Sequence, residues 1–214
     1  KAGIEKCIRK FIEFGNDGNK ATMVDNADWL TKLNYLEFLR DIGPHFSVNR
    51  MLSFDSVQLR LQKEEHMSFL EFNYMILQAY DFYYLNKNYN CKLQLCGGDQ
   101  WGNTVAGVEL MRRLNFAKGE ESEEVYGLST ALLTDSNGKK MGKSEGNALW
   151  VDGDLFPAFD YFQFFRNVAD ADVEKFLKVY TELPIDEIKK LSSLKDKEIN
   201  EAKKILAFEA TKIC

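Results

Sequence analysis

The 214-residue sequence has no run of apolar residues long enough to form a transmembrane helix, which needs about 18 or more. Its first ten residues, KAGIEKCIRK, also lack the apolar core of a secretory signal peptide. Internal repeats and low-complexity segments are absent as well. We therefore expect a cytoplasmic protein that spans no membrane.

Cysteine and histidine are scarce, with four and two residues respectively. Cys91 and Cys96 have opposite parity along a predicted strand, so their side chains face opposite ways and a disulfide between them is not expected. A zinc site needs clustered ligands, which the isolated His45 and His66 do not supply. The sequence predicts reduced thiols and no metal site.

The remaining composition is that of a globular protein, because 45% hydrophobic and 13% aromatic residues are enough to bury a core. The length fits one large domain or a domain and a half. A net charge of −5 argues against a general polyanion binder. It does not exclude RNA or phosphate as a ligand, because the field at a site depends on nearby charges.

Helical and strand-like patterns alternate along the first part of the chain, which predicts an α/β fold with a parallel sheet. Ser68 and Glu71 form a capping box that marks a strong helix start. After about residue 155 only helical spacing remains, which predicts a boundary to an all-helical part. The predicted helices cover residues 29–40, 53–62, 69–85 and 101–114, and the strand-like segments cover 91–96, 128–134 and 148–151.

The predicted helix 69–85 is apolar nearly all round, so we expect it to be buried. Tyr74, Gln78 and Asp81 stand at positions i, i+4 and i+7, which places them on one face. A buried carboxylate without partners is costly. This polar stripe therefore either belongs to a satisfied network between helices or lines a polar pocket.

The segment 94–100, QLCGGDQ, can supply a second polar wall at the end of a predicted strand, where α/β folds place ligands. Gly97 and Gly98 allow the backbone to approach a ligand, and Asp99 can accept a hydrogen bond from a ribose hydroxyl. The alternative is a tight turn with Asp99 as the cap of the next helix.

Three lysines and two glycines crowd the segment 139–147, KKMGKSEGN, which suggests an anionic ligand. A phosphate-binding P-loop is one alternative, but only three residues separate Gly138 from Gly142, where that motif has four. A solvated surface loop is another alternative, because runs of charge usually face water.

Residues 140–144, KMGKS, also resemble the KMSKS signature of class I aminoacyl-tRNA synthetases, with Gly142 in place of the first serine. The segments HFSVNRM at 45–51, YMILQAYDF at 74–82 and GGDQWGN at 97–103 resemble bacterial-type tyrosyl-tRNA synthetases in the same order. This resemblance implies the second half of a Rossmann-like nucleotide-binding domain, with an inserted dimerisation segment, in residues 1–154. It implies part of a helical anticodon-binding domain in residues 155–214.

The resemblance also implies roles for individual residues. Asp81 matches the reader of the substrate's phenolic hydroxyl, and Cys96 and Gly98 differ from the family's frequent glycine and serine. The residues that the resemblance implies for tyrosine binding are Tyr74, Gln78, Asp81, Gln94 and Gln100, with Asn26 and Trp29 bordering the site. Those implied for ATP binding are Gly97, Asp99 and Lys143. Those implied for catalysis are Lys140, Lys143 and Ser144.

The activity implied by the resemblance is that of a tyrosine–tRNA ligase. Its substrates are L-tyrosine, ATP with Mg²⁺, and tRNA(Tyr), and it acts as a homodimer. The HIGH-like motif of this enzyme class is absent, so we expect a fragment that lacks the N-terminal segment and the C-terminal RNA-binding module. The alternatives are a P-loop-like NTPase and a catalytically dead module for RNA binding or dimerisation.

Overall fold

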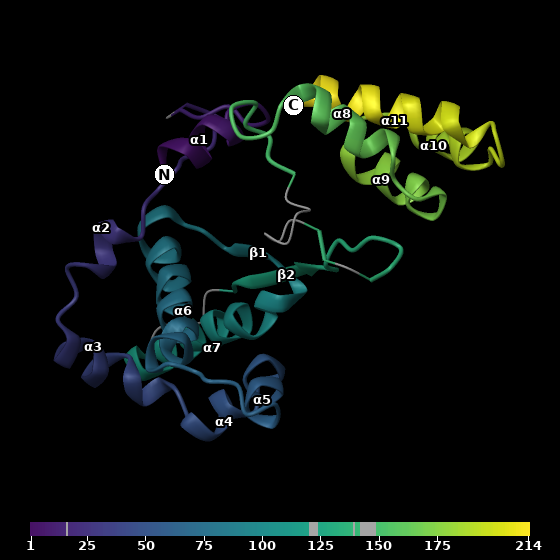
Figure 1. Cartoon of the computed structure of the whole chain (residues 1–214). Helices are drawn as coiled ribbons and strands as arrows, with labels where there is room; N and C mark the ends of the chain where they lie inside the picture. The colour runs from purple at the N-terminus through teal and green to yellow at the C-terminus, as the bar shows by residue number, and fades with distance from the viewer. Residues whose placement is uncertain (16, 120–123, 139, 142–148) are drawn as a thin grey trace. The chain divides into compact units, whose positions relative to one another are not determined.

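The computed structural model describes the whole chain except residues 16, 120–123, 139 and 142–148 (Figure 1). The described residues form two compact units. One comprises residues 25–132, and the other comprises residues 1–24 together with 133–214. The two units are defined by which residues pack together. The boundary between functional domains that we expect near residue 155 stays a prediction.

The described residues of the unit 25–132 form eight helical segments and one parallel strand pair. The two longest helices, α6 (Phe69–Tyr89) and α7 (Trp101–Lys118), pack against each other. The shorter segments are α2 (Ala27–Leu30), α3 (Tyr35–Asp41), η1 (Gly43–His45), α4 (Val48–Leu52), α5 (Asp55–Gln62) and η2 (Gly98–Gln100).

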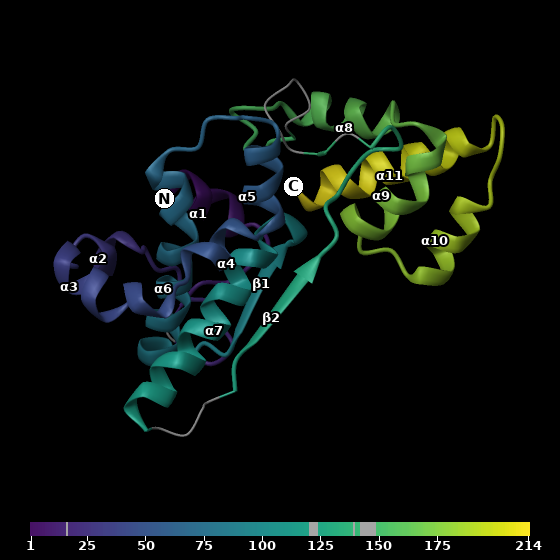
Figure 2. The same cartoon turned by 90° about the horizontal axis from the view of Figure 1, so that it is seen from below.

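The strands β1 (Leu93–Gly97) and β2 (Tyr126–Thr130) pair in parallel, with Leu93 opposite Tyr126 and Gly97 opposite Thr130. The chain passes from β1 through α7 to β2, and α7 contacts both strands (Figure 2). The expected strand–turn–helix–strand unit is therefore confirmed, although β2 begins and ends earlier than the predicted strand 128–134. Residues 149–151 form no strand, and residue 148 lies outside the described residues.

Helix α6 begins as expected, because the Ser68 side chain accepts a hydrogen bond from the Glu71 backbone N–H and the Glu71 carboxylate accepts one from the Ser68 backbone N–H. The expectation that this helix is buried all round is wrong. Its first turns expose Phe69, Leu70 and Tyr74, with Phe69 69% accessible. Its buried side chains lie on two core clusters: Ala79 packs with residues of α7, and Met75 packs with Met51 and Val57 of α4 and α5.

The predicted helix 29–40 is interrupted. Asn34 caps α3 by accepting hydrogen bonds from the backbone N–H groups of Leu36 and Glu37. Since asparagine competes with the helix by bonding to nearby backbone groups, it favours a cap over an internal position. The chain therefore ends α2 at Leu30 and starts α3 at Tyr35.

The other unit is helical, as expected for the C-terminal part of the chain. Its core joins Phe165, Phe176 and Leu206, all buried, and α8 packs along α11 (Figure 2). Its elements are α1 (Ala2–Ile8), α8 (Ala158–Arg166), η3 (Asp170–Asp172), α9 (Val173–Tyr180), α10 (Ile185–Ser192) and α11 (Ile199–Ile213).

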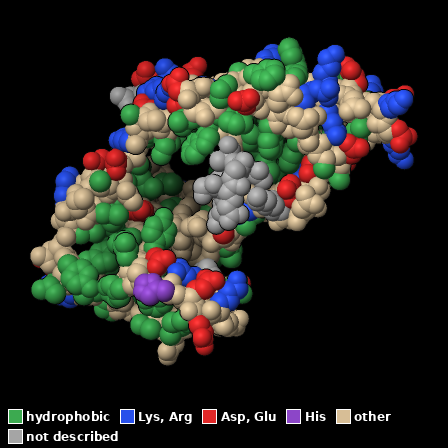
Figure 3. All heavy atoms as spheres, viewed as in Figure 1, with side chains coloured by type: hydrophobic (Ala, Val, Ile, Leu, Met, Phe, Trp, Pro, Cys, Tyr) green, Lys and Arg blue, Asp and Glu red, His purple; other side chains and the backbone are tan. Residues whose placement is uncertain are grey.

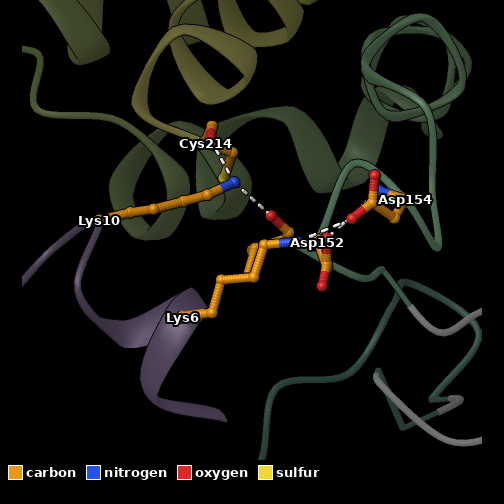
Figure 4. Close-up of polar contacts among 6 residues, drawn as sticks. Lys6, Lys10, Asp152, Asp154 and Cys214 are labelled. Carbon is orange, nitrogen blue, oxygen red and sulfur yellow. Dashed lines mark hydrogen bonds and ion pairs between the residues drawn. The ribbon is translucent and has the colours of Figure 1, made fainter. Parts of the chain in front are cut away.

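Two lysines at the start of the chain attach to the segment before α8 (Figure 4). The Lys6 ammonium lies 2.9 Å from an Asp152 oxygen and 2.8 Å from an Asp154 oxygen. Lys10 donates hydrogen bonds to the carbonyl oxygens of Val151 and Cys214. These contacts explain why residues 1–24 belong to the helical unit although they lie far from it in sequence.

Among the residues that the structure describes, no helix combines the length and the apolar character needed to cross a membrane. All four cysteines are free thiols, each partly accessible.

Candidate functional site

The Asp81 carboxylate is held by side chains from another segment of the chain. Asp81 lies in the middle of α6, where its carboxylate accepts one hydrogen bond on each oxygen. The Trp29 indole N–H lies 2.7 Å from Oδ1, and the Asn26 amide nitrogen lies 3.0 Å from Oδ2. A carboxylate has about four acceptor positions, so two donors leave room for a further hydroxyl.

The two donors come from the short helix α2 and the residue before it. Trp29 is buried, and its ring stacks on Tyr84 with centroids 4.4 Å apart and an interplanar angle of 14°. Tyr84 lies one turn beyond Asp81 along α6. The stacking fixes the indole, so the position of the Asp81 carboxylate is determined by the packing of α2 on α6.

The Asp81 carboxyl lies in a partly apolar environment. Burial raises its pKa, and the hydrogen bonds from Asn26 and Trp29 offset this only in part. Between its unfolded-state pKa and its raised folded-state pKa, the folded chain binds more protons than the unfolded chain. Stability is therefore lost as the pH rises through this window, and the ionised carboxylate destabilises the fold above it.

Gln78 belongs to a second polar group on the α6–α7 contact. The Asn103 amide nitrogen lies 2.9 Å from the Gln78 side-chain oxygen and 3.0 Å from the Gln100 side-chain oxygen. One asparagine therefore joins two of the predicted tyrosine-binding glutamines. Asn103 was missed as a site residue, although its place three residues after Gln100 on a helix was a usable signal.

Tyr74, the third member of the stripe, is 54% exposed and lies near the start of α6. Gln94 differs from it sharply: its side-chain oxygen is buried and has no hydrogen-bond partner within the described part of the chain. Buried polar atoms almost always have partners. An unpaired one on the strand that ends at Gly97 marks a position where a ligand can supply the missing donor.

The carboxyl end of β1 leads directly into η2 and α7. A side chain at Gly97 would place its Cβ 2.9 Å from an Asp99 carboxylate oxygen, so the Asp99 side chain can hold this position only because residue 97 is glycine, and would otherwise have to shift. Beside Asp99 lies a cavity of about 490 Å³ between α5 and the start of α7, lined by Ser53, Asp55, Gly98 and Trp101 among others. Its size is that of a small-molecule site.

The predicted catalytic residues lie elsewhere in the chain. Lys140 is in the helical unit, where it pairs with Thr134 in an isolated antiparallel bridge. Lys143 and Ser144 lie outside the described residues. Asn26, Trp29, Gln78, Asp81, Gln94, Gly97, Asp99 and Gln100 all lie in the unit 25–132.

Comparison with known proteins decides the family. The sequence model described as tRNA synthetases class I (W and Y) matches residues 1–214, the whole chain. The chain belongs to this family. Its catalytic-domain fold, mostly helical with a small parallel sheet, agrees with that assignment.

Tyrosine–tRNA ligases are similar in sequence over nearly the whole chain. The protein from Wolbachia pipientis (strain wPip) is 58% identical over 99% of this chain, and the one from Zymomonas mobilis is 57% identical over 99%. The matches cover 49% and 50% of those proteins. The chain thus spans about half the length of the curated relatives it matches.

Solved structures give the same answer. A C-terminally truncated mitochondrial tyrosyl-tRNA synthetase from Coccidioides posadasii superposes with a TM-score of 0.79 at 29% identity, covering 99% of this chain and 61% of that one. The C-terminally truncated mitochondrial enzyme from Aspergillus nidulans superposes with a TM-score of 0.72 at 32% identity, and the match covers 99% of this chain and 59% of that one. The resemblance to tyrosyl-tRNA synthetases is confirmed.

Proposed function

We propose that this chain is the tyrosine-reading part of a tyrosine–tRNA ligase. The observation that carries the proposal is the Asp81 carboxylate, held by Trp29 and Asn26 with acceptor capacity left over. A fixed acceptor in a partly apolar environment suits a single phenolic hydroxyl. Relatives that are 55–58% identical over almost all of this chain carry the name tyrosine–tRNA ligase.

The remaining polar groups fit the other end of the same substrate. Gln78, Gln100 and the exposed Tyr74 supply oxygens for the α-ammonium group of tyrosine. The unpaired side-chain oxygen of Gln94 is a further acceptor for a substrate donor. Gly97 and Asp99, beside the cavity at the end of β1, suit the ribose of ATP.

The reaction has two steps. The carboxylate of tyrosine attacks the α-phosphate of ATP to form tyrosyl-adenylate and pyrophosphate, and a terminal hydroxyl of tRNA(Tyr) then takes the tyrosyl group. No side chain becomes covalently attached, so catalysis depends on positioning and on stabilising phosphate charge. Lys140, Lys143 and Ser144 are proposed for the second task. Mg²⁺ enters the proposal as the companion of ATP.

The domain roles follow from the same proposal. Residues 1–154 carry the second half of a Rossmann-like catalytic domain with the dimerisation insertion, and residues 155–214 carry part of the anticodon-binding domain. We place the protein in the cytoplasm, where its tRNA substrate is charged.

Tyrosine-dependent exchange of labelled pyrophosphate into ATP tests this function. The full-length protein that contains this segment is expected to catalyse the exchange with tyrosine and far more slowly with phenylalanine. ATP hydrolysis that proceeds equally well without tyrosine would contradict the proposal and favour a nucleotide hydrolase instead.

The proposed homodimer is built on the segment 43–75. This part of the unit exposes large apolar side chains, including Phe69 and Leu70, and Figure 3 shows further hydrophobic surface around α3. In the full-length protein, replacing Phe69 by aspartate is expected to yield monomers, because a charge buried in the contact costs several kcal/mol. Sedimentation at micromolar concentration measures the change.

Phe116 provides the matched control. It is 87% exposed near the end of α7, outside the segment 43–75, so Phe116→Asp is expected to remain dimeric. A wild-type protein that sediments as a monomer, or a Phe69→Asp variant that still pairs, would show that the interface lies elsewhere.

A further inference from the structure

Lys140 lies on one arm of a short hairpin in the helical unit. The Met141 N–H donates to the Leu133 carbonyl at 2.9 Å, and Thr134 and Lys140 face each other in the antiparallel bridge. The tight turn 135–138 closes the hairpin. Leu133 and Met141 both pack against the helical core. The base of the hairpin is thus fixed by apolar contacts, whereas the turn 135–138, DSNG, consists of polar residues and glycine.

The turn is held by a buried carboxylate. Asp172, at the end of η3, is only 3% exposed, and its Oδ2 accepts the Ser136 backbone N–H at 3.0 Å. Its other oxygen lies 2.9 Å from the ammonium of Lys175 in α9. Lys175 also donates to the Thr134 carbonyl. One ion pair of the helical core therefore contacts the hairpin at two backbone positions.

These polar contacts hold a turn that has a cavity on one side. A cavity of about 350 Å³ lies between the turn and α8, lined by Ser136, Asn137, Gln163 and Asn167 among others. Burial raises the pKa of Asp172, but hydrogen bonds from Lys175 and Ser136 outweigh this and leave it below its usual value. Asp172 is therefore ionised at neutral pH, so it forms an ion pair with Lys175, and the hydrogen bond that it accepts from the Ser136 N–H is charge-assisted.

The contacts on the other side of the lysine segment are of a different kind. Lys6 reaches Asp152 and Asp154 (Figure 4), but the Lys6 side chain is 55% exposed and that of Asp154 is 85% exposed. Exposed ion pairs contribute little to stability, because water and salt screen them. Asp172 is the stronger candidate for a fixed attachment, because its own carboxylate is buried, although the Lys175 side chain is 37% exposed.

We propose that Asp172 is a positioning residue for Lys140: its carboxylate, through the Ser136 backbone and Lys175, holds the hairpin so that the Lys140 ammonium is presented to the reacting phosphates. Asp172 itself touches no substrate. This inference rests on the proposed function, in which Lys140 stabilises phosphate charge during tyrosine activation. Small displacements of a positioned group are costly to the rate, even when the changed residue is remote.

The test uses pyrophosphate exchange by the full-length enzyme. Asp172→Ala is expected to lower kcat about 10- to 100-fold while the KM for tyrosine stays unchanged, because the tyrosine-binding residues lie in the unit 25–132. Asp172→Asn is expected to recover part of the rate, because its amide oxygen still accepts the Ser136 N–H. Asp170→Ala is the matched control, since Asp170 is an exposed carboxylate that pairs with Lys203.

A second variant tests the same contact without changing a residue of the helical core, in case Asp172→Ala disrupts that core. Ser136 is the second residue of a turn closed by the Gly138 N–H and the Asp135 carbonyl, a position that proline favours. Ser136→Pro therefore removes the N–H that Asp172 accepts while it keeps the turn and the core. We expect it to lower kcat in the same way as Asp172→Ala.

A double variant separates positioning from mere stability. If Asp172 acts through Lys140, Asp172→Ala adds little to the loss already caused by Lys140→Ala. Full additivity, or wild-type rates for both Asp172→Ala and Ser136→Pro in an enzyme that otherwise activates tyrosine, would overturn the inference and leave the proposed function intact. A wild-type enzyme without tyrosine-dependent exchange would overturn both.

Discussion

In the full-length enzyme, Asp81→Ala is expected to lower kcat/KM for tyrosine about 10- to 100-fold more than kcat/KM for phenylalanine. The reason is that the carboxylate accepts the substrate's hydroxyl, and a hydrogen bond to a charged group contributes about 1.5–3 kcal/mol. Phenylalanine has no hydroxyl and gains nothing from this acceptor. Both specificity constants are measured by pyrophosphate exchange.

The competing explanation is that Asp81 only braces α6. In that case the loss of Asp81 lowers kcat/KM equally for tyrosine and for phenylalanine, and it lowers the melting temperature of the protein. Alanine alone does not separate the explanations cleanly, because it leaves the Trp29 and Asn26 donors without their acceptor. Asparagine is the better stability control, since it keeps an oxygen for Trp29 and can donate to a rotated Asn26 amide.

Asp81→Asn also has a defined pH signature. Since burial raises the pKa of Asp81, the ionised carboxylate destabilises the wild-type fold at neutral pH. The variant is therefore expected to be at least as stable as the wild type at pH 7, and this advantage disappears below the unfolded-state pKa. A reduced tyrosine preference without loss of stability supports substrate reading. An unchanged preference refutes it.

Lys143→Ala is expected to slow tyrosyl-adenylate formation by about 10²-fold or more, the loss typical of a removed donor to transition-state charge. Tyrosine binding is expected to stay nearly intact, because the tyrosine-binding residues are in a different segment from the lysines. Single-turnover formation of the adenylate gives the rate, and equilibrium titration with tyrosine gives the affinity.

Lys178 is a suitable control for the lost charge. It is an exposed lysine of α9 that pairs with Glu174 one turn away, and Lys178→Ala is expected to leave the rate unchanged. A normal rate of adenylate formation by Lys143→Ala, together with weakened tyrosine binding, would assign this lysine to the amino acid and not to the phosphates.

Local sequence signals predicted the longest helices of the unit 25–132, both of its strands and the helical character of the C-terminal part. The capping box at Ser68 and Glu71 predicted the start of α6, and the glycine pair at the end of β1 predicted the step from strand through turn to helix. The break at Asn34 could not be seen from apolar spacing, because it depends on competition between a cap and a continuous helix. The exposure of Phe69 was also missed, since periodicity does not show which apolar face lacks a neighbour.

The candidate site was predicted in part. Helical spacing alone aligned Gln78 and Asp81, and the structure shows both side chains in hydrogen-bond networks. The sequence could not show which residues donate hydrogen bonds to Asp81, because Trp29 and Asn26 lie more than 50 positions away from it along the chain. The attachment of the Lys140 hairpin by Asp172 was missed for the same reason, since their contact joins segments 36 positions apart.

The most direct test of the central claim, that Asp81 reads the substrate's hydroxyl, is a crystal structure of the full-length protein with bound tyrosine. We predict the phenolic oxygen within about 2.5–3.0 Å of an Asp81 carboxylate oxygen, with Trp29 and Asn26 still donating to the same carboxylate. Tyrosine bound with its hydroxyl facing other side chains, and Asp81 bonded only to Trp29 and Asn26, would contradict the claim.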